Sequence, residues 1–132
     1  PGFTVFRDFA HAPSKVRATV DGVKASYPNR TVTAVLELHT FSSLNKAFLP
    51  TYANALDGAD EAVVFYDPNV LEHKGMPALE PSFVREAFGH PDSLKIFTSA
   101  SELHHYVQRL APQNRTLLLM SSGWFGNAEW SW

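Results

Sequence analysis

The chain has 132 residues, enough for one hydrophobic core and therefore for one domain. Hydrophobic residues make up 45% of it and charged residues 18%, which is typical of a folded globular protein and excludes a disordered one. The formal net charge of −2 gives no reason to expect a nucleic acid as partner, and the absence of cysteine excludes a disulfide framework, a thiolate zinc site and a cysteine nucleophile.

Strand-like and helix-like segments alternate from the start of the chain. Residues 3–7 form an apolar run that predicts a first strand. Residues 13–27 follow as a predicted helix, because apolar residues from Val16 to Tyr27 recur at helical spacing. Pro13 suits the first helical turn, where its missing N–H costs nothing.

The same reasoning predicts the remaining elements. Strands are expected at 31–38, 61–66, 94–98 and 116–120. Helices are expected at 44–56, 80–88 and 101–110, the last with Ser101 as its N-cap. Loops or turns are expected at 58–60, 67–79 and 89–92. Such alternation implies βαβ units, and therefore an α/β domain with a mostly parallel sheet covered on both faces. The longest apolar run, residues 117–120, is far too short to span a membrane.

The loops that leave the predicted strands carry most of the chemically useful side chains. They are residues 8–11, 37–40, 66–69 and 121–126, whereas the loops that enter the strands contain common turn residues. In an open parallel sheet, ligands bind outside the carboxyl ends of the strands. We therefore predict that these groups converge on one edge, although loops are often polar without any function.

The first of these loops runs into a helix N-terminus, whose free N–H groups favour an anion such as phosphate or carboxylate. Asp8 is expected close by, either as a functional group or only as a cap of that helix. The sequence contains no glycine-rich phosphate loop, so any main nucleotide site is expected elsewhere.

Several segments resemble one family in the right order. Residues 8–14, DFAHAPS, resemble the D-[YF]-[AG]-H-x-P-[ST] segment that opens the C-terminal domain of Mur ligases. Residues 120–126, MSSGWFG, are similar to the M-S-N-G-x-F-G ending of the muropeptide-recycling branch of that family. Residues 35–37 and 55–61 are similar to the second strand and the third-strand entry of the same branch.

This resemblance implies a Rossmann-like C-terminal domain of an ATP-dependent amide ligase. Residues 1–132 would then be a fragment of a cytoplasmic, three-domain enzyme whose central domain carries the P-loop and most of the ATP and magnesium site. Such enzymes join a peptide or amino acid to UDP-N-acetylmuramate through an acyl phosphate, in peptidoglycan recycling or biosynthesis. The isolated chain is expected to be inactive, and its partners are the missing domains and these substrates.

The resemblance also implies roles for individual residues. Asp8 and His11 match the loop that faces the nucleotide and are the implied catalytic residues, and His39 lies where relatives place basic residues near the phosphates. Relatives of the recycling branch have E-P-R where residues 37–39 read Glu-Leu-His, which leaves the recycling ligase and the L-alanine-adding ligase both open. The implied amine-substrate-binding residues are Asp67, Asn69, Ser122, Gly123 and Phe125.

The histidines of the last predicted helix do not indicate a metal site. No metal site is predicted within the chain, because the neighbouring His104 and His105 do not share a helix face. The alternative to a ligase domain is a stand-alone, non-catalytic Rossmann-like module for binding or regulation.

Overall fold

The computed structural model describes residues 3–89, 93–110, 113–122 and 125. Within them, five strands form a single sheet in the order β1-β5-β2-β3-β4, and every pairing is parallel. The strands are β1 (Phe3–Asp8), β2 (Thr31–Glu37), β3 (Glu61–Phe65), β4 (Leu94–Phe97) and β5 (Arg115–Met120). The sheet thus confirms the α/β prediction and all five predicted strands, and every described strand is parallel to its neighbours.

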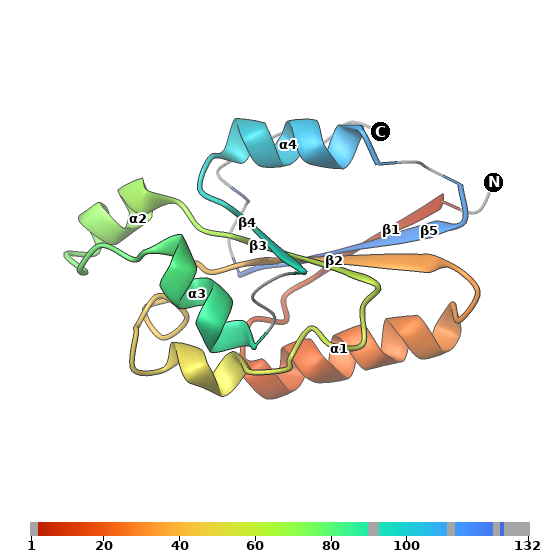
Figure 1. The fold of residues 1–132 in the computed structure, drawn as a ribbon, viewed down its shortest axis with the longest axis horizontal. Coiled ribbons are helices and arrows are strands. Elements are labelled where there is room, and N and C mark those ends of the chain that lie inside the picture. The colour runs from red at the N-terminus through yellow and green to blue at the C-terminus, as the bar shows by residue number, and fades with distance from the viewer. Residues whose placement is uncertain (1–2, 90–92, 111–112, 123–124, 126–132) are drawn as a thin grey trace.

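Helices cover both faces of the sheet and produce three layers (Figure 1). The helical elements are α1 (Pro13–Ser26), a 3-10 turn η1 (Leu49–Tyr52), α2 (Pro68–His73), α3 (Pro81–Phe88) and α4 (Ala100–Gln108). Figure 1 shows α4 above the sheet and α1, η1 and α3 below it. None of the helices in the described ranges is both long and apolar enough to cross a membrane.

Two apolar clusters hold the layers together, one on each face of the sheet. Below it, side chains of α1, η1 and α3, such as Val20, Tyr52 and Phe88, pack against alternate strand residues such as Leu36. Above it, Leu103 and Val107 of α4 pack against the intervening strand residues. Because neighbouring strand residues point to opposite faces, a strand buried on both sides is a continuous apolar run.

The segment between β2 and β3 differs from the prediction. A helix was expected over 44–56, but only η1 is helical there. The Asn45 side chain accepts hydrogen bonds from the N–H groups of Ala47 (2.8 Å) and Phe48 (3.2 Å), so it competes with helix formation. Pro50 also lacks the N–H that a continuous helix requires.

Two smaller predictions are also corrected. The predicted loop 67–79 contains α2, which starts where the Asp67 carboxylate accepts from the N–H of Asn69 at 2.9 Å and a proline follows. Helix α4 is capped by Ser99 rather than Ser101, since Ser99 Oγ accepts from the N–H of Glu102 at 3.3 Å. The predicted turn 89–92 lies mostly outside the described residues.

Candidate functional site

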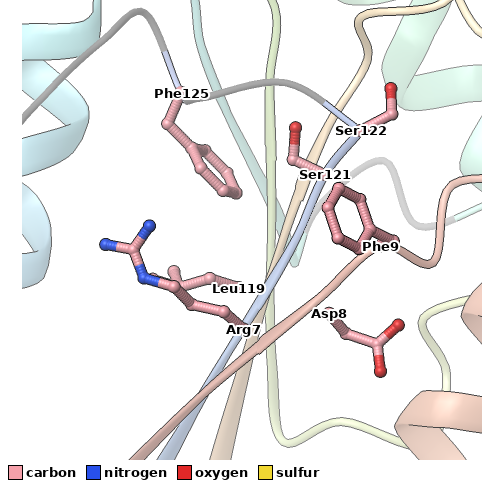
Figure 2. A pocket seen from close by; sticks show the side chains of 7 residues that line it. All are labelled: Arg7, Asp8, Phe9, Leu119, Ser121, Ser122 and Phe125. Carbon is pink, nitrogen blue, oxygen red and sulfur yellow. The ribbon is translucent and has the colours of Figure 1, made fainter.

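A cavity of about 220 Å³ opens at the carboxyl ends of β1 and β5 (Figure 2). Figure 2 shows that Arg7 and Asp8, neighbours on β1, project to opposite sides of the strand, with Arg7 beside Leu119 and Phe125. The cavity therefore combines a cation, hydroxyls and apolar walls, while the Asp8 carboxylate projects from the other side of β1. The lining residues are Arg7, Asp8, Phe9, Leu119, Ser121, Ser122 and Phe125.

Strand register brings the first and last of the strand-exit loops together. Asp8, the last residue of β1, pairs with Met120, the last residue of β5. The pairing continues one step further, because the N–H of Ser121 donates to the carbonyl of Asp8 at 3.0 Å. Asp8 and Ser122 consequently line one cavity, as the predicted convergence requires, while their roles in binding stay predictions.

The Asp8 carboxylate shapes its own loop and does not cap α1. Its Oδ1 accepts from the N–H of Ala10 at 2.7 Å, which forms an Asx-type turn. The N-cap of α1 is Ala12, and no side chain caps that helix. The helix-cap interpretation of Asp8 is therefore wrong, and its exposed side chain projects from the opposite side of β1 to that of Arg7.

The His11 side chain is exposed, but its backbone carbonyl is hydrogen-bonded to a core residue. Its Nδ1 lies 2.7 Å from the carbonyl of Phe9, and its own carbonyl accepts a hydrogen bond from the hydroxyl of Tyr52. Tyr52 is buried and stacks on Phe88 with ring centroids 5.2 Å apart. Burial raises the pKa of Tyr52 to about 12. Tyr52 was not among the predicted site residues, although it anchors this loop.

A buried carboxyl group joins the second loop to the last one. Glu37 ends β2 with only 2% exposure, and its Oε1 accepts from the N–H of Phe125 at 2.9 Å and from the hydroxyl of Ser121. Its Oε2 lies 3.8 Å from Nδ1 of His39, whose side chain is 38% exposed. Glu37, which was not among the predicted site residues, thus binds the predicted residue Phe125 and lies near the predicted residue His39.

The other predicted amine-side residues lie apart from this cavity or outside the described residues. Asp67 and Asn69 follow β3, which is separated from β5 by β2, and neither lines the cavity. The contact seen for them is the N-cap of α2. Gly123 lies outside the described residues. Binding by Asp67 and Asn69 stays a prediction.

Two exposed aromatic side chains lie on loops at the same edge. Phe9, after β1, is 79% exposed, and Phe41, after β2, is 60% exposed. Phe41 also lines a second, more open cavity of about 440 Å³, and Lys74 Nζ lies 4.2 Å from its ring centroid. The carboxyl edge therefore exposes large apolar groups that the described part of the chain does not cover.

Comparison with known proteins identifies the family. The model of the family described as "Mur ligase, glutamate ligase domain" matches residues 1–123. The chain belongs to this Mur ligase domain family. The sequence-based resemblance to Mur ligases is thereby confirmed.

Relatives of this Mur ligase domain are ligases of peptidoglycan precursors. The UDP-N-acetylmuramate–L-alanine ligase of Limosilactobacillus reuteri is 41% identical over 61 residues, which cover 46% of this chain and 14% of that protein. The matched segments of several such alanine ligases amount to 13–30% of their lengths. This chain thus spans well under two thirds of these relatives.

Solved structures show the same architecture. A Haemophilus ducreyi domain, assigned to a UDP-N-acetylmuramate:L-alanyl-γ-D-glutamyl-meso-diaminopimelate ligase, matches 96% of this chain and 85% of its own at 26% identity and a TM-score of 0.59. The UDP-N-acetylmuramate–alanine ligase of Thermotoga maritima matches 96% of this chain and 25% of its own, at 18% identity and a TM-score of 0.64. The fold is that of a Mur ligase C-terminal domain.

Proposed function

We propose that this Mur ligase domain is the amine-side, C-terminal domain of an ATP-dependent amide ligase that recycles peptidoglycan fragments in the cytoplasm. The observation that carries the proposal is the meeting of the β1 and β5 exits around one cavity, together with the contacts that Glu37, at the end of β2, makes with Ser121 and Phe125 on its wall. Family membership favours this function over a stand-alone regulatory module.

The proposed reaction has two steps, and this domain acts in the second. The muramyl carboxylate of UDP-N-acetylmuramate first takes the γ-phosphoryl group of ATP, giving an acyl phosphate and ADP. The amine of the incoming peptide then attacks the acyl carbon, the C–N bond forms, phosphate leaves, and the amine releases a proton. The domain would hold the amine next to the acyl group, which lowers the entropic cost of the reaction.

The proposed division of roles follows the positions of the loops. Asp8 and His11, after β1, and His39, after β2, would face the nucleotide, with Asp8 and His11 in catalytic positions. Ser122 and Phe125 would face the amine substrate, because both line the cavity. The other residues in the proposed amine site are Asp67, Asn69 and Gly123.

ATP and magnesium would be bound mainly outside this domain. Among the described residues, no group of three or more His, Asp or Glu side chains is placed to hold a metal. The sequence also lacks a phosphate-binding loop. We therefore assign ATP and magnesium mainly to a central domain of the same polypeptide, which would dock on the carboxyl edge near the exposed Phe9 and Phe41.

The test is ligation by the full-length protein. Supplied with ATP, magnesium and UDP-N-acetylmuramate, it should release phosphate and form an amide with the L-alanyl-γ-D-glutamyl-meso-diaminopimelate tripeptide in preference to L-alanine. Mass spectrometry identifies the product. Residues 1–132 alone should show neither ATPase nor ligase activity. Preference for L-alanine would replace the recycling assignment with the alanine-adding one, and no ligation with either amine would overturn the function.

A further inference from the structure

Glu37 is unusual in its surroundings. It ends a strand whose preceding residues are all apolar or small apart from its two threonines, yet its carboxyl group is buried to 2% exposure. Burying such a group is unfavourable unless hydrogen bonds replace its lost water. Oε1 of Glu37 accepts hydrogen bonds from the hydroxyl of Ser121 and from the N–H of Phe125.

These two donors mark the two ends of one loop. Ser121 and Phe125 are four residues apart, and both donate to the same carboxyl oxygen, so Glu37 holds these two residues beside the end of β2. Phe125 has a φ of +50°, a left-handed conformation uncommon for an aromatic residue. Surrounding contacts must hold such a conformation, and its N–H bond to Glu37 is one of them.

The two residues that Glu37 binds form part of the cavity wall. Ser121, Ser122 and Phe125 line it, and the N–H of Ser121 also reaches the carbonyl of Asp8 across the sheet. Oε2 of Glu37 meanwhile faces His39 Nδ1 at 3.8 Å. One carboxyl group therefore contacts the amine-side loop with one oxygen and faces the nucleotide-side loop with the other.

We propose that Glu37 is a positioning residue for the amine substrate: it fixes both ends of the 121–125 loop and thereby sets the cavity wall against which the amine is held. This role rests on the proposed function. Because the contact is made through an acceptor oxygen at a fixed distance, an amide of the same length should preserve it. The methyl side chain of E37A has no acceptor oxygen and should not preserve this contact.

A second carboxyl group supplies the matched control. Glu61 pairs in register with Thr33, which lies on the same face of the sheet as Glu37 because four residues separate them on β2. Glu61 accepts from Thr33 Oγ1 at 2.6 Å and from the Arg115 guanidinium. It thus resembles Glu37 in bonding but lies at the opposite, amino edge, away from the cavity.

The experiment measures KM for the tripeptide amine in the full-length protein, at saturating ATP and UDP-N-acetylmuramate, with melting temperatures of every variant. E37A should raise this KM roughly tenfold or more, because loss of the two hydrogen bonds misplaces the binding wall. Its kcat should fall less than its KM rises. E37Q should stay within about threefold of wild type, since the amide oxygen accepts from the same donors. E61A should lower the melting temperature and leave the KM unchanged.

Each result decides the proposal. An unchanged KM in folded E37A, an E37Q variant as impaired as E37A, or the same KM rise in E61A would overturn the positioning role. If E37A does not fold, S121A decides, because it removes one of the two donors and should raise KM by a smaller factor; no rise overturns the role. Absence of ligation by the wild-type protein overturns the proposed function and this role with it.

Discussion

The two edges of the sheet use their polar side chains differently. At the amino edge, charged groups hold the strands and helices to one another: Lys24 on α1 pairs with Asp60 before β3 at 2.7 Å, and Arg115 on β5 pairs with Glu61 on β3. Arg30 likewise donates to Thr4 Oγ1 on β1 at 2.8 Å. These contacts join segments that are far apart in the sequence.

At the carboxyl edge, polar groups mostly contact backbone within their own loop. Asp8 binds the N–H of Ala10, and His11 contacts the carbonyl of Phe9. Both side chains remain exposed, as do the rings of Phe9 and Phe41. The charged groups at the amino edge stabilise the fold, whereas the exposed side chains of Asp8 and His11 at the carboxyl edge are presented outward on loops. Substitutions at the amino edge should therefore lower mainly the stability, and substitutions of exposed groups at the carboxyl edge should lower mainly the rate of ligation.

The largest expected effect belongs to Asp8. In the full-length ligase, D8A should lower turnover by roughly 10²–10³, which is the usual effect of removing one positioned charged contact in a transition state. It should cost only about 1 kcal/mol of stability, because the loop loses one hydrogen bond to Ala10. Ligation rate and melting temperature are measured on the same preparation.

The matched variant for Asp8 is D8N. Its amide oxygen preserves the hydrogen bond from Ala10 and removes the charge, so it should fold like wild type and still turn over slowly. Normal turnover per folded molecule in both variants would remove Asp8 from the site. It would also erase the contrast between the edges, because Asp8 would then act only in its own turn.

A smaller effect is expected at Tyr52, which holds the carbonyl of His11. Y52F should lower the free energy of unfolding by about 0.5–1.5 kcal/mol at pH 7, through loss of that hydrogen bond. Burial raises the pKa of Tyr52 to about 12, above the value of about 10 for an unfolded tyrosine. Its contribution to stability is therefore complete below pH 10 and is lost as the pH rises from about 10 to about 12. Y52F should lose less stability than wild type over that interval in urea titrations.

The Y66F variant is the control that shows whether the hydroxyl of Tyr52 affects ligation as well as stability. Its hydroxyl donates to the carbonyl of Leu79 at 2.6 Å, and burial, with the charge of Glu80, raises its pKa to about 12 as well. Y66F should therefore show a similar loss of stability and a similar alkaline response. Only Y52F, however, releases the His11 loop, so only Y52F should slow ligation. Equal turnover in the two variants would show that the anchoring of His11 has no functional consequence.

The strands, and the sheet edge at which their exit loops lie, could be predicted because they depend on short-range pattern. Continuous apolar runs give buried parallel strands, and parallel strands place their exits on one edge. The segment 44–56 has apolar residues at helical spacing, but Asn45 and Pro50 favour turns, and the buried residues Leu49 and Tyr52 satisfy the core without a long helix. Local hydrogen bonding overrode the periodicity there.

The contacts of Glu37 could not be predicted in this way. Its two hydrogen-bond donors are 84 and 88 residues distant in the sequence, and only the β2–β5 pairing brings them together. The same holds for Tyr52, which lies 41 residues from its partner His11. Alpha-helix α2 is different, since Asp67 followed by Pro68 is a local helix-start signal that was available and was read as a loop.

The smallest expected effect lies at the amino edge, in the pair of Asp60 and Lys24. Burial works to raise the pKa of Asp60, but the hydrogen bonds from Lys24 and from the N–H of Val32, with the charge of Lys24, outweigh it and hold the pKa below its usual range. A lowered folded-state pKa contributes stability that is present above the unfolded pKa of about 4 and is lost as the pH falls through the folded one. The Asp60 side chain is 41% exposed, so solvent screening limits the contribution to less than about 1 kcal/mol.

D60N should therefore be slightly less stable than wild type at pH 7, and the difference should shrink as the pH falls below about 4. Ligation per folded molecule should not change. Urea unfolding at pH 7 and pH 3, with and without high salt, measures this. A stability difference that persists at pH 3, or a change in turnover at pH 7, would mean that the amino edge does more than hold the fold together.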